Sequence, residues 1–99
     1  MIPDKVKIGI YNYDVKETDD IIIVDNRVCS GSITYDKLEI KLTKDRPIQK
    51  KYQTLLHEIV HGIIREYDLD LKKHDEETVV DTLAIGIYQV LMDNELKLK

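Results

Sequence analysis

His57, Glu58 and His61 form an H-E-x-x-H sequence, the pattern in this chain with the clearest chemistry. Residues four apart on a helix lie one turn apart on the same face, so both imidazoles could reach one metal ion. Glu58 stands beside them, where a carboxylate can handle the proton of an activated water molecule. The segment therefore predicts a hydrolytic zinc centre on one helix.

Apolar residues recur at three- and four-residue steps around this motif and predict a helix over residues 48–67. On a helical projection from His57, the apolar stripe covers roughly 160° to 340°, whereas His61 and Glu58 fall between roughly 40° and 100°. The histidines therefore border the packing face, which argues against core histidines. The remaining alternative is that they are ordinary solvated residues.

A second apolar stripe predicts a helix over residues 75–93, with Glu77 at its margin and Asp81 one turn further. Packing the two stripes together could bring Glu77 to the histidines, and two imidazoles with one carboxylate are a common catalytic zinc set. Asp81 could orient a ligating histidine, or it could be solvated. Glu77 could instead only favour the helix N-terminus. Glu76 is the weaker competing ligand because it projects into the apolar side.

Further side chains could assist. His74 could be a third ligand from the loop, a hydrogen-bond donor in the transition state, or an exposed loop residue. Arg65, one turn beyond His61, could bind a substrate carbonyl, pair with Glu58 or be solvated. Four tyrosines could each supply a hydrogen-bond donor to an oxyanion: Tyr35, Tyr52, Tyr67 and Tyr88. Of these, Tyr52 and Tyr67 lie on the apolar stripe of the first helix.

Strand-like segments fill the N-terminal half, over about residues 5–43. We expect one strand over residues 5–13, a second at 21–24, a bend at 30–32 and the clearest alternating strand at 38–42. Strands followed by helices predict an α+β domain, a small antiparallel sheet followed by two packed helices, and residues 1–99 are expected to form one domain.

The net charge of −4 and the dispersed basic residues give no support for nucleic-acid binding. No apolar run approaches membrane-spanning length and no signal peptide is visible, so we expect a cytoplasmic protein without membrane partners. Cys29 is the only cysteine, which excludes an intramolecular disulfide and leaves a cysteine-based zinc site without partners. We expect it to be a half-buried strand residue.

The chain resembles the zincin metallopeptidases. Residues 55–62, followed by Glu76-Glu77-Thr78-Val79-Val80-Asp81, look like the gluzincin arrangement of H-E-x-x-H plus E-x-x-x-D. More closely, residues 28–94 resemble the small ImmA/IrrE-type metallopeptidases common in bacteriophages, which also carry a Gly-Ser-Ile-Thr-Tyr-like strand. The resemblance implies His57, His61 and Glu77 as zinc ligands, and the host cytoplasm as the location of a phage-encoded protein. It also implies that the strand Leu38–Leu42 lies along the cleft. The sequence departs from the metzincin pattern, and we expect no partner domain for DNA or ligand sensing.

Two functions from different classes follow. The first is a zinc peptidase that cleaves a protein or peptide substrate, with Glu58 as general base and then general acid. The second is a non-catalytic module that zinc stabilises and that serves interaction or regulation, with a regulatory partner protein. Glu58 separates them, because a structural zinc site does not require it. A third and weakest hypothesis is a metal-free regulatory protein with an accidental motif.

Overall fold

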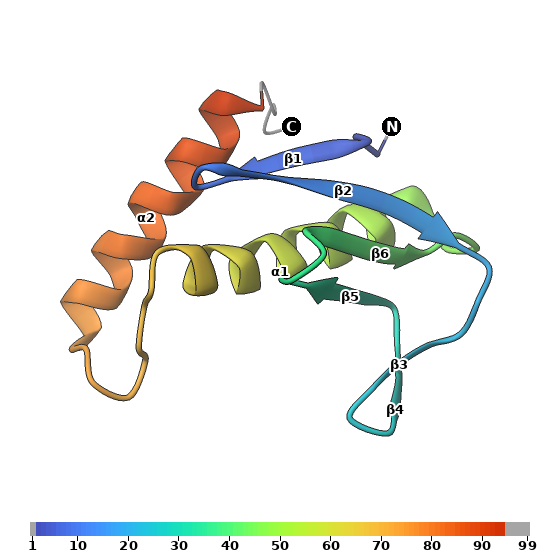
Figure 1. Cartoon of the computed structure of the whole chain (residues 1–99), viewed down its shortest axis with the longest axis horizontal. Helices are drawn as coiled ribbons and strands as arrows, with labels where there is room; N and C mark the ends of the chain where they lie inside the picture. Colours follow the sequence, from blue (N-terminus) through green and yellow to red (C-terminus); the bar gives the residue numbers. More distant parts are fainter. Residues whose placement is uncertain (1, 95–99) are drawn as a thin grey trace.

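The computed structural model of the chain describes residues 2–94, in which six strands precede two helices (Figure 1). The elements are β1 Lys5–Ile8, β2 Tyr11–Thr18, β3 Ile22–Val24, β4 Arg27–Cys29, β5 Gly31–Thr34, β6 Glu39–Thr43, α1 Ile48–Glu66 and α2 Glu76–Asp93. The α+β class is confirmed. Both helices lie within a residue of their expected bounds.

Four strands form the main sheet in the order β1-β2-β6-β5, and β3 and β4 form a separate hairpin. β1 pairs with β2 and β5 pairs with β6 in antiparallel fashion, but β2 and β6 are parallel, with Asp14 opposite Glu39 and Thr18 opposite Thr43. The expectation of an all-antiparallel sheet is wrong at this pair. The chain leaves the sheet after β2, forms the hairpin and returns through β5, so β6 enters the sheet in the direction of β2.

The single strand expected over residues 5–13 is two strands joined by a tight turn. Gly9 has a φ of +61°, a left-handed conformation that glycine adopts without steric cost. Ile10, which the alternation placed with Val6 and Ile8, is a turn residue and is 79% exposed. The periodicity continued through the turn, and this concealed the break.

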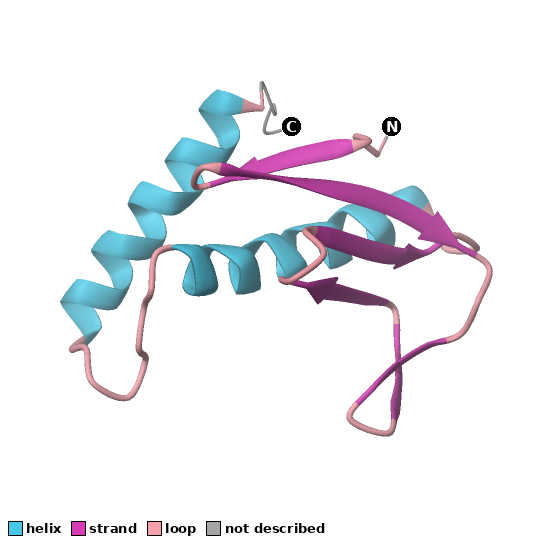
Figure 2. Cartoon of the chain, in the orientation of Figure 1, coloured by secondary structure: helices cyan, strands magenta, loops and turns pink. Residues whose placement is uncertain are grey.

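Figure 2 shows α1 along one face of the sheet, and most of the buried core residues belong to these two elements. Period-two alternation puts apolar side chains on the helix-facing side of each strand, and the opposite face carries polar groups such as Lys16 and Glu39, whose charged atoms lie 2.7 Å apart. The buried core residues are Val6, Ile8, Tyr13, Val15, Ile40, Leu42, Leu55, Ile59, Ile63 and Val90. This packing fixes the roll of α1, and therefore which of its side chains face the pocket described below.

α2 packs across the C-terminal end of α1 and beside β1 (Figure 1). Gly86 permits the close crossing, because a Cβ there would lie 2.4 Å from Cγ2 of Ile63. At the other end of the contact, Asn94 accepts a hydrogen bond from the Lys7 N–H (2.6 Å) and donates one to the Lys7 carbonyl (2.9 Å). Gln89 similarly accepts from the Gly9 N–H at 2.8 Å. Side-chain amides of α2 thus occupy the outer edge of β1.

Large apolar side chains are exposed at several places, two of which bear on function. One is on α2, where Val80, Ile85, Tyr88 and Met92 are exposed. The other is the β3–β4 hairpin, which projects from the sheet (Figure 1) and exposes Ile23 and Val28. Within residues 2–94, neither helix is both long and apolar enough to cross a membrane.

Candidate active site

The two imidazoles of the H-E-x-x-H sequence face each other across one turn of α1. Nε2 of His57 and Nε2 of His61 lie 3.2 Å apart, and the ring planes meet at 72°. Zinc–nitrogen bonds of 2.0–2.1 Å with tetrahedral angles place two nitrogen ligands about 3.3 Å apart. The pair therefore has a separation that suits two ligands of one zinc ion.

Glu58 is buried, with 6% of its surface exposed, whereas His57 and His61 are exposed. Burial raises the pKa of its carboxyl group, and positive charge on His57 or His61 would lower it. Ionisable groups whose pKa is shifted by burial and by neighbouring charges cluster at functional sites, and a largely buried carboxylate beside two imidazoles is such a group.

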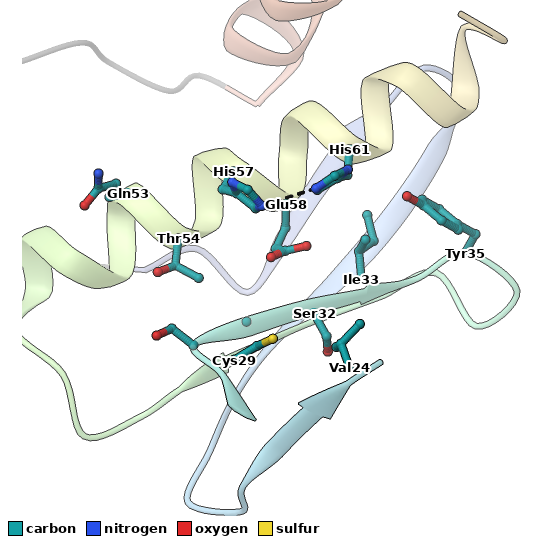
Figure 3. A pocket seen from close by; sticks show the side chains of 12 residues that line it. Val24, Cys29, Ser32, Ile33, Tyr35, Gln53, Thr54, His57, Glu58 and His61 are labelled. Carbon is teal, nitrogen blue, oxygen red and sulfur yellow. Dashed lines mark hydrogen bonds between the residues drawn. The ribbon is translucent and has the colours of Figure 1, made fainter. Parts of the chain in front are cut away.

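A pocket of about 650 Å³ opens in front of these side chains. Figure 3 shows the Glu58 carboxylate directed from α1 toward β5, with Cys29 and Val24 of the β3–β4 hairpin on the far side. The lining residues are Val24, Cys29, Ser30, Gly31, Ser32, Ile33, Tyr35, Gln53, Thr54, His57, Glu58 and His61. Three elements therefore build the pocket: α1 supplies the ionisable groups, β5 one wall, and the hairpin an apolar wall.

The strand beside the pocket is β5, at the edge of the sheet, where we expected the strand Leu38–Leu42. That expectation is wrong, because β6 lies inside the sheet between β2 and β5. Ile40 and Leu42 are fully buried in the core, and Leu38 precedes the strand with a φ of +52°. The strong alternation marked the most buried strand, and a central strand has no free edge to offer.

Gly31 explains how closely β5 approaches the helix. A Cβ at this position would lie 2.5 Å from Cγ2 of Thr54 and 3.3 Å from Oε2 of Glu58. The sequence indicated a bend over residues 30–32 but not that it would cover Glu58. The signal was a glycine within a short strand, which often marks a close approach of the backbone to another group.

Tyr35 and Arg65 form a pair at the His61 end of the pocket. The Arg65 guanidinium carbon lies 4.9 Å from the centre of the Tyr35 ring, within the range of a cation–π contact. Of the roles considered for Arg65, solvation agrees with the exposure of this residue, and its guanidinium also lies over the Tyr35 ring. Tyr35 lines the pocket, whereas the exposed Tyr88 of α2 does not.

The acidic residues of α2 stand apart from this site. Glu77 and Asp81 are both exposed on the first two turns of α2, and neither lines the pocket. His74, in the connection between the helices, contacts the backbone of Asp70 through Nδ1. Within residues 2–94, no three His, Cys, Asp or Glu side chains are gathered so that they could hold a metal ion. The structure thus brings together His57, Glu58 and His61, and the third ligand stays a prediction.

Cys29 is half-buried on its strand, as expected, and it also lines the apolar wall of the pocket, which the sequence did not indicate. No family model, curated protein or solved structure matches this chain.

Proposed function

We propose that the protein is a zinc-dependent peptidase whose site is centred on His57, Glu58 and His61. One observation carries the proposal: two imidazole nitrogens stand at a separation that suits zinc, next to a buried carboxylate whose pKa is raised by that burial. The resemblance to small ImmA/IrrE-type zincins rests on the same residues. In that arrangement His57 and His61 would hold the metal, with Glu77 proposed as the third ligand.

A bound zinc ion would polarise the scissile carbonyl and make water acidic enough to ionise near neutral pH. Glu58 is placed to take the proton from the attacking water and to pass it to the leaving amine. Its raised pKa suits the first half of this cycle, because a carboxylate of higher pKa takes the proton from water more readily. Glu58 therefore acts first as base and then as acid.

The edge of β5 offers a way to hold an extended peptide. β5 pairs with β6 on one side, and no described strand pairs with its other side. Residues of β5 also line the pocket, so a substrate backbone added to this edge would pass in front of Glu58. We infer that the substrate is a flexible or unfolded segment, because only an extended chain can add to a strand edge.

The test combines metal content with cleavage. Wild type, Glu58→Gln and His57→Ala are incubated with zinc and a mixture of unstructured peptides, with and without chelator. We expect zinc-dependent cleavage by wild type, zinc binding without cleavage by Glu58→Gln, and neither by His57→Ala. General acid–base catalysis contributes about 10²–10⁴-fold, so cleavage by Glu58→Gln at the wild-type rate would refute the mechanism.

Glu77→Ala tests the third ligand, with Glu76→Ala as its matched control because both carboxylates stand exposed in the first turn of α2. We expect a loss of zinc affinity in the first variant only. Equal affinity in both variants would mean that the third ligand is another group.

A non-catalytic zinc-stabilised interaction module is the second candidate. The observation in its favour is the exposed apolar surface of α2, because contiguous apolar patches often mark protein-binding sites. It predicts that Glu58→Gln retains zinc binding and partner binding, including the increase in melting temperature on adding zinc. The peptidase predicts loss of cleavage in the same variant.

A further inference from the structure

Tyr35 follows β5 and reaches the pocket from the side opposite the helix. Its half-buried ring lines the pocket together with His57, Glu58 and His61. Figure 3 shows the hydroxyl end of the ring turned toward α1, on the side of His61. A hydrogen-bond donor is therefore aimed into the space that a carbonyl held by the histidine end of the site would occupy.

Arg65 restrains this ring. Residue 65 stands four positions after His61, so the same face of α1 carries both side chains. The guanidinium lies over the Tyr35 ring, 4.9 Å from its centre, and a flat cation of this kind holds an aromatic ring by stacking. One helix thus sets the positions of both imidazoles and, through Arg65, of the tyrosine.

Burial is the main reason that the Tyr35 hydroxyl stays protonated. Burial raises its pKa, as do the carboxylates Glu58 and Glu66, and Arg65 opposes them. The hydroxyl therefore keeps its proton at neutral pH and can donate a hydrogen bond. A protonated hydroxyl is also a poor metal ligand, so it would not displace a substrate carbonyl oxygen from a metal ion.

We propose that Tyr35 is a further catalytic residue, whose hydroxyl donates a hydrogen bond to the oxyanion that forms on the scissile carbonyl, and that Arg65 is its positioning residue. The proposal rests on the peptidase function above. Water forms the new C–O bond, its proton passes to Glu58, and the carbonyl electron pair moves to oxygen. The oxyanion then collapses as the C–N bond breaks, and the proton on Glu58 passes to the amine. Tyr35 keeps its own proton throughout.

The test compares Tyr35→Phe with Tyr88→Phe, which removes an exposed hydroxyl outside the pocket. Loss of one oxyanion donor lowers kcat by about 10²–10³-fold, so we expect a fall of that order with little change in KM. Tyr88→Phe should match wild type. A phosphinic peptide, whose tetrahedral anion imitates the oxyanion, should bind Tyr35→Phe more weakly by a similar factor. A plain product peptide should bind both proteins equally.

Zinc content is measured in the same preparations. Cleavage by Tyr35→Phe at the wild-type rate, while Glu58→Gln is inactive, would overturn the role of Tyr35 and leave the peptidase function standing. A joint fall of kcat and zinc content would assign Tyr35 a structural role and would also overturn the proposal. Wild type without zinc-dependent cleavage would overturn the peptidase function and this proposal together.

Arg65 is tested without metal or substrate. The titration of Tyr35 is followed by nuclear magnetic resonance of carbon-labelled tyrosine in metal-free protein, with Tyr35→Phe identifying the signal. Because Arg65 lowers the pKa of Tyr35, Arg65→Gln should move the titration to higher pH, and Arg65→Lys should restore part of the difference. An unchanged titration in Arg65→Gln would remove Arg65 from the proposal.

Discussion

The backbone of Gly31 lies directly against the side chains of Glu58 and Thr54. A methyl group on residue 31 would stand 2.5 Å from Cγ2 of Thr54 and 3.3 Å from Oε2 of Glu58. Gly31→Ala should therefore push β5 away from α1, with a loss of about 1–3 kcal/mol in the free energy of unfolding. Urea unfolding followed by circular dichroism measures the change.

Thr54→Ser removes the methyl group that causes most of this clash and keeps the hydroxyl, which donates to the Lys50 carbonyl. The double variant Gly31→Ala/Thr54→Ser should recover part of the lost stability, so the two changes should not be additive. Strict additivity would show that β5 does not approach the helix as closely as described.

Glu58 makes the stability of the metal-free protein depend on pH. Because burial raises its pKa in the folded protein, the folded state binds this proton more tightly than the unfolded chain does. The resulting contribution to stability is complete below the ordinary pKa of the group and is lost as the pH rises through the raised value. Glu58→Gln should therefore melt at a higher temperature than wild type at neutral pH, and the difference should disappear near pH of about 4.

Scanning calorimetry in chelator checks this expectation. Glu76→Gln is the control, because that carboxylate is exposed at the start of α2 and favours the helix N-terminus, so its loss should slightly lower the melting temperature. A neutral-pH melting temperature of Glu58→Gln below that of wild type would contradict the unfavourable burial of the charge.

The amide of Asn94 joins the last turn of α2 to the edge of β1. Asn94→Ala removes both hydrogen bonds to Lys7 and should lower the free energy of unfolding by about 1–3 kcal/mol. Hydrogen exchange of the Lys7 amide should accelerate at the same time. Asn12→Ala, an exposed amide on β2, serves as control. Equal effects of the two substitutions would argue against a specific role of Asn94 at this edge.

Gly86 sets the distance between the helices. Alanine favours a helix over glycine by about 1 kcal/mol, yet the added methyl group would meet Ile63 at 2.4 Å. Overpacking costs about 1–3 kcal/mol, so Gly86→Ala should destabilise the protein or, at the least, show none of the expected helical gain. In an Ile63→Ala background, where space is available, the same substitution should be stabilising. A gain of about 1 kcal/mol in the wild-type background would contradict the close crossing.

The sequence predicted the helices well because each depends on a long periodic stripe. The α+β class followed from the order of the elements, and His57, Glu58 and His61 come together because their spacing alone places them on adjacent turns. Such local features are fixed within one helix and need no knowledge of the rest of the chain.

Tertiary relationships were harder to predict. The burial of Glu58 depends on Gly31, which lies 27 positions earlier in the sequence. The sequence of the helix alone does not predict which side of its apolar stripe a strand will cover. The turn at Gly9 was hidden because the alternation continued through it, and the edge position of β5 depends on the parallel pairing of β2 with β6. The position of Glu77 relative to the histidines depends on the crossing angle between the two helices. A projection of each helix by itself does not predict that angle.

The hairpin β3–β4 forms part of the connection between the parallel strands β2 and β6, yet it takes no part in the main sheet. Lengthening such a loop is inexpensive, since each doubling of its length adds only about 0.6 kcal/mol of closure entropy. Val24 and Cys29 can therefore be exchanged, or the hairpin extended, while the four-stranded scaffold stays as it is. Substitutions in the hairpin during evolution could therefore change which ligands the pocket prefers and leave the fold of the main sheet unchanged.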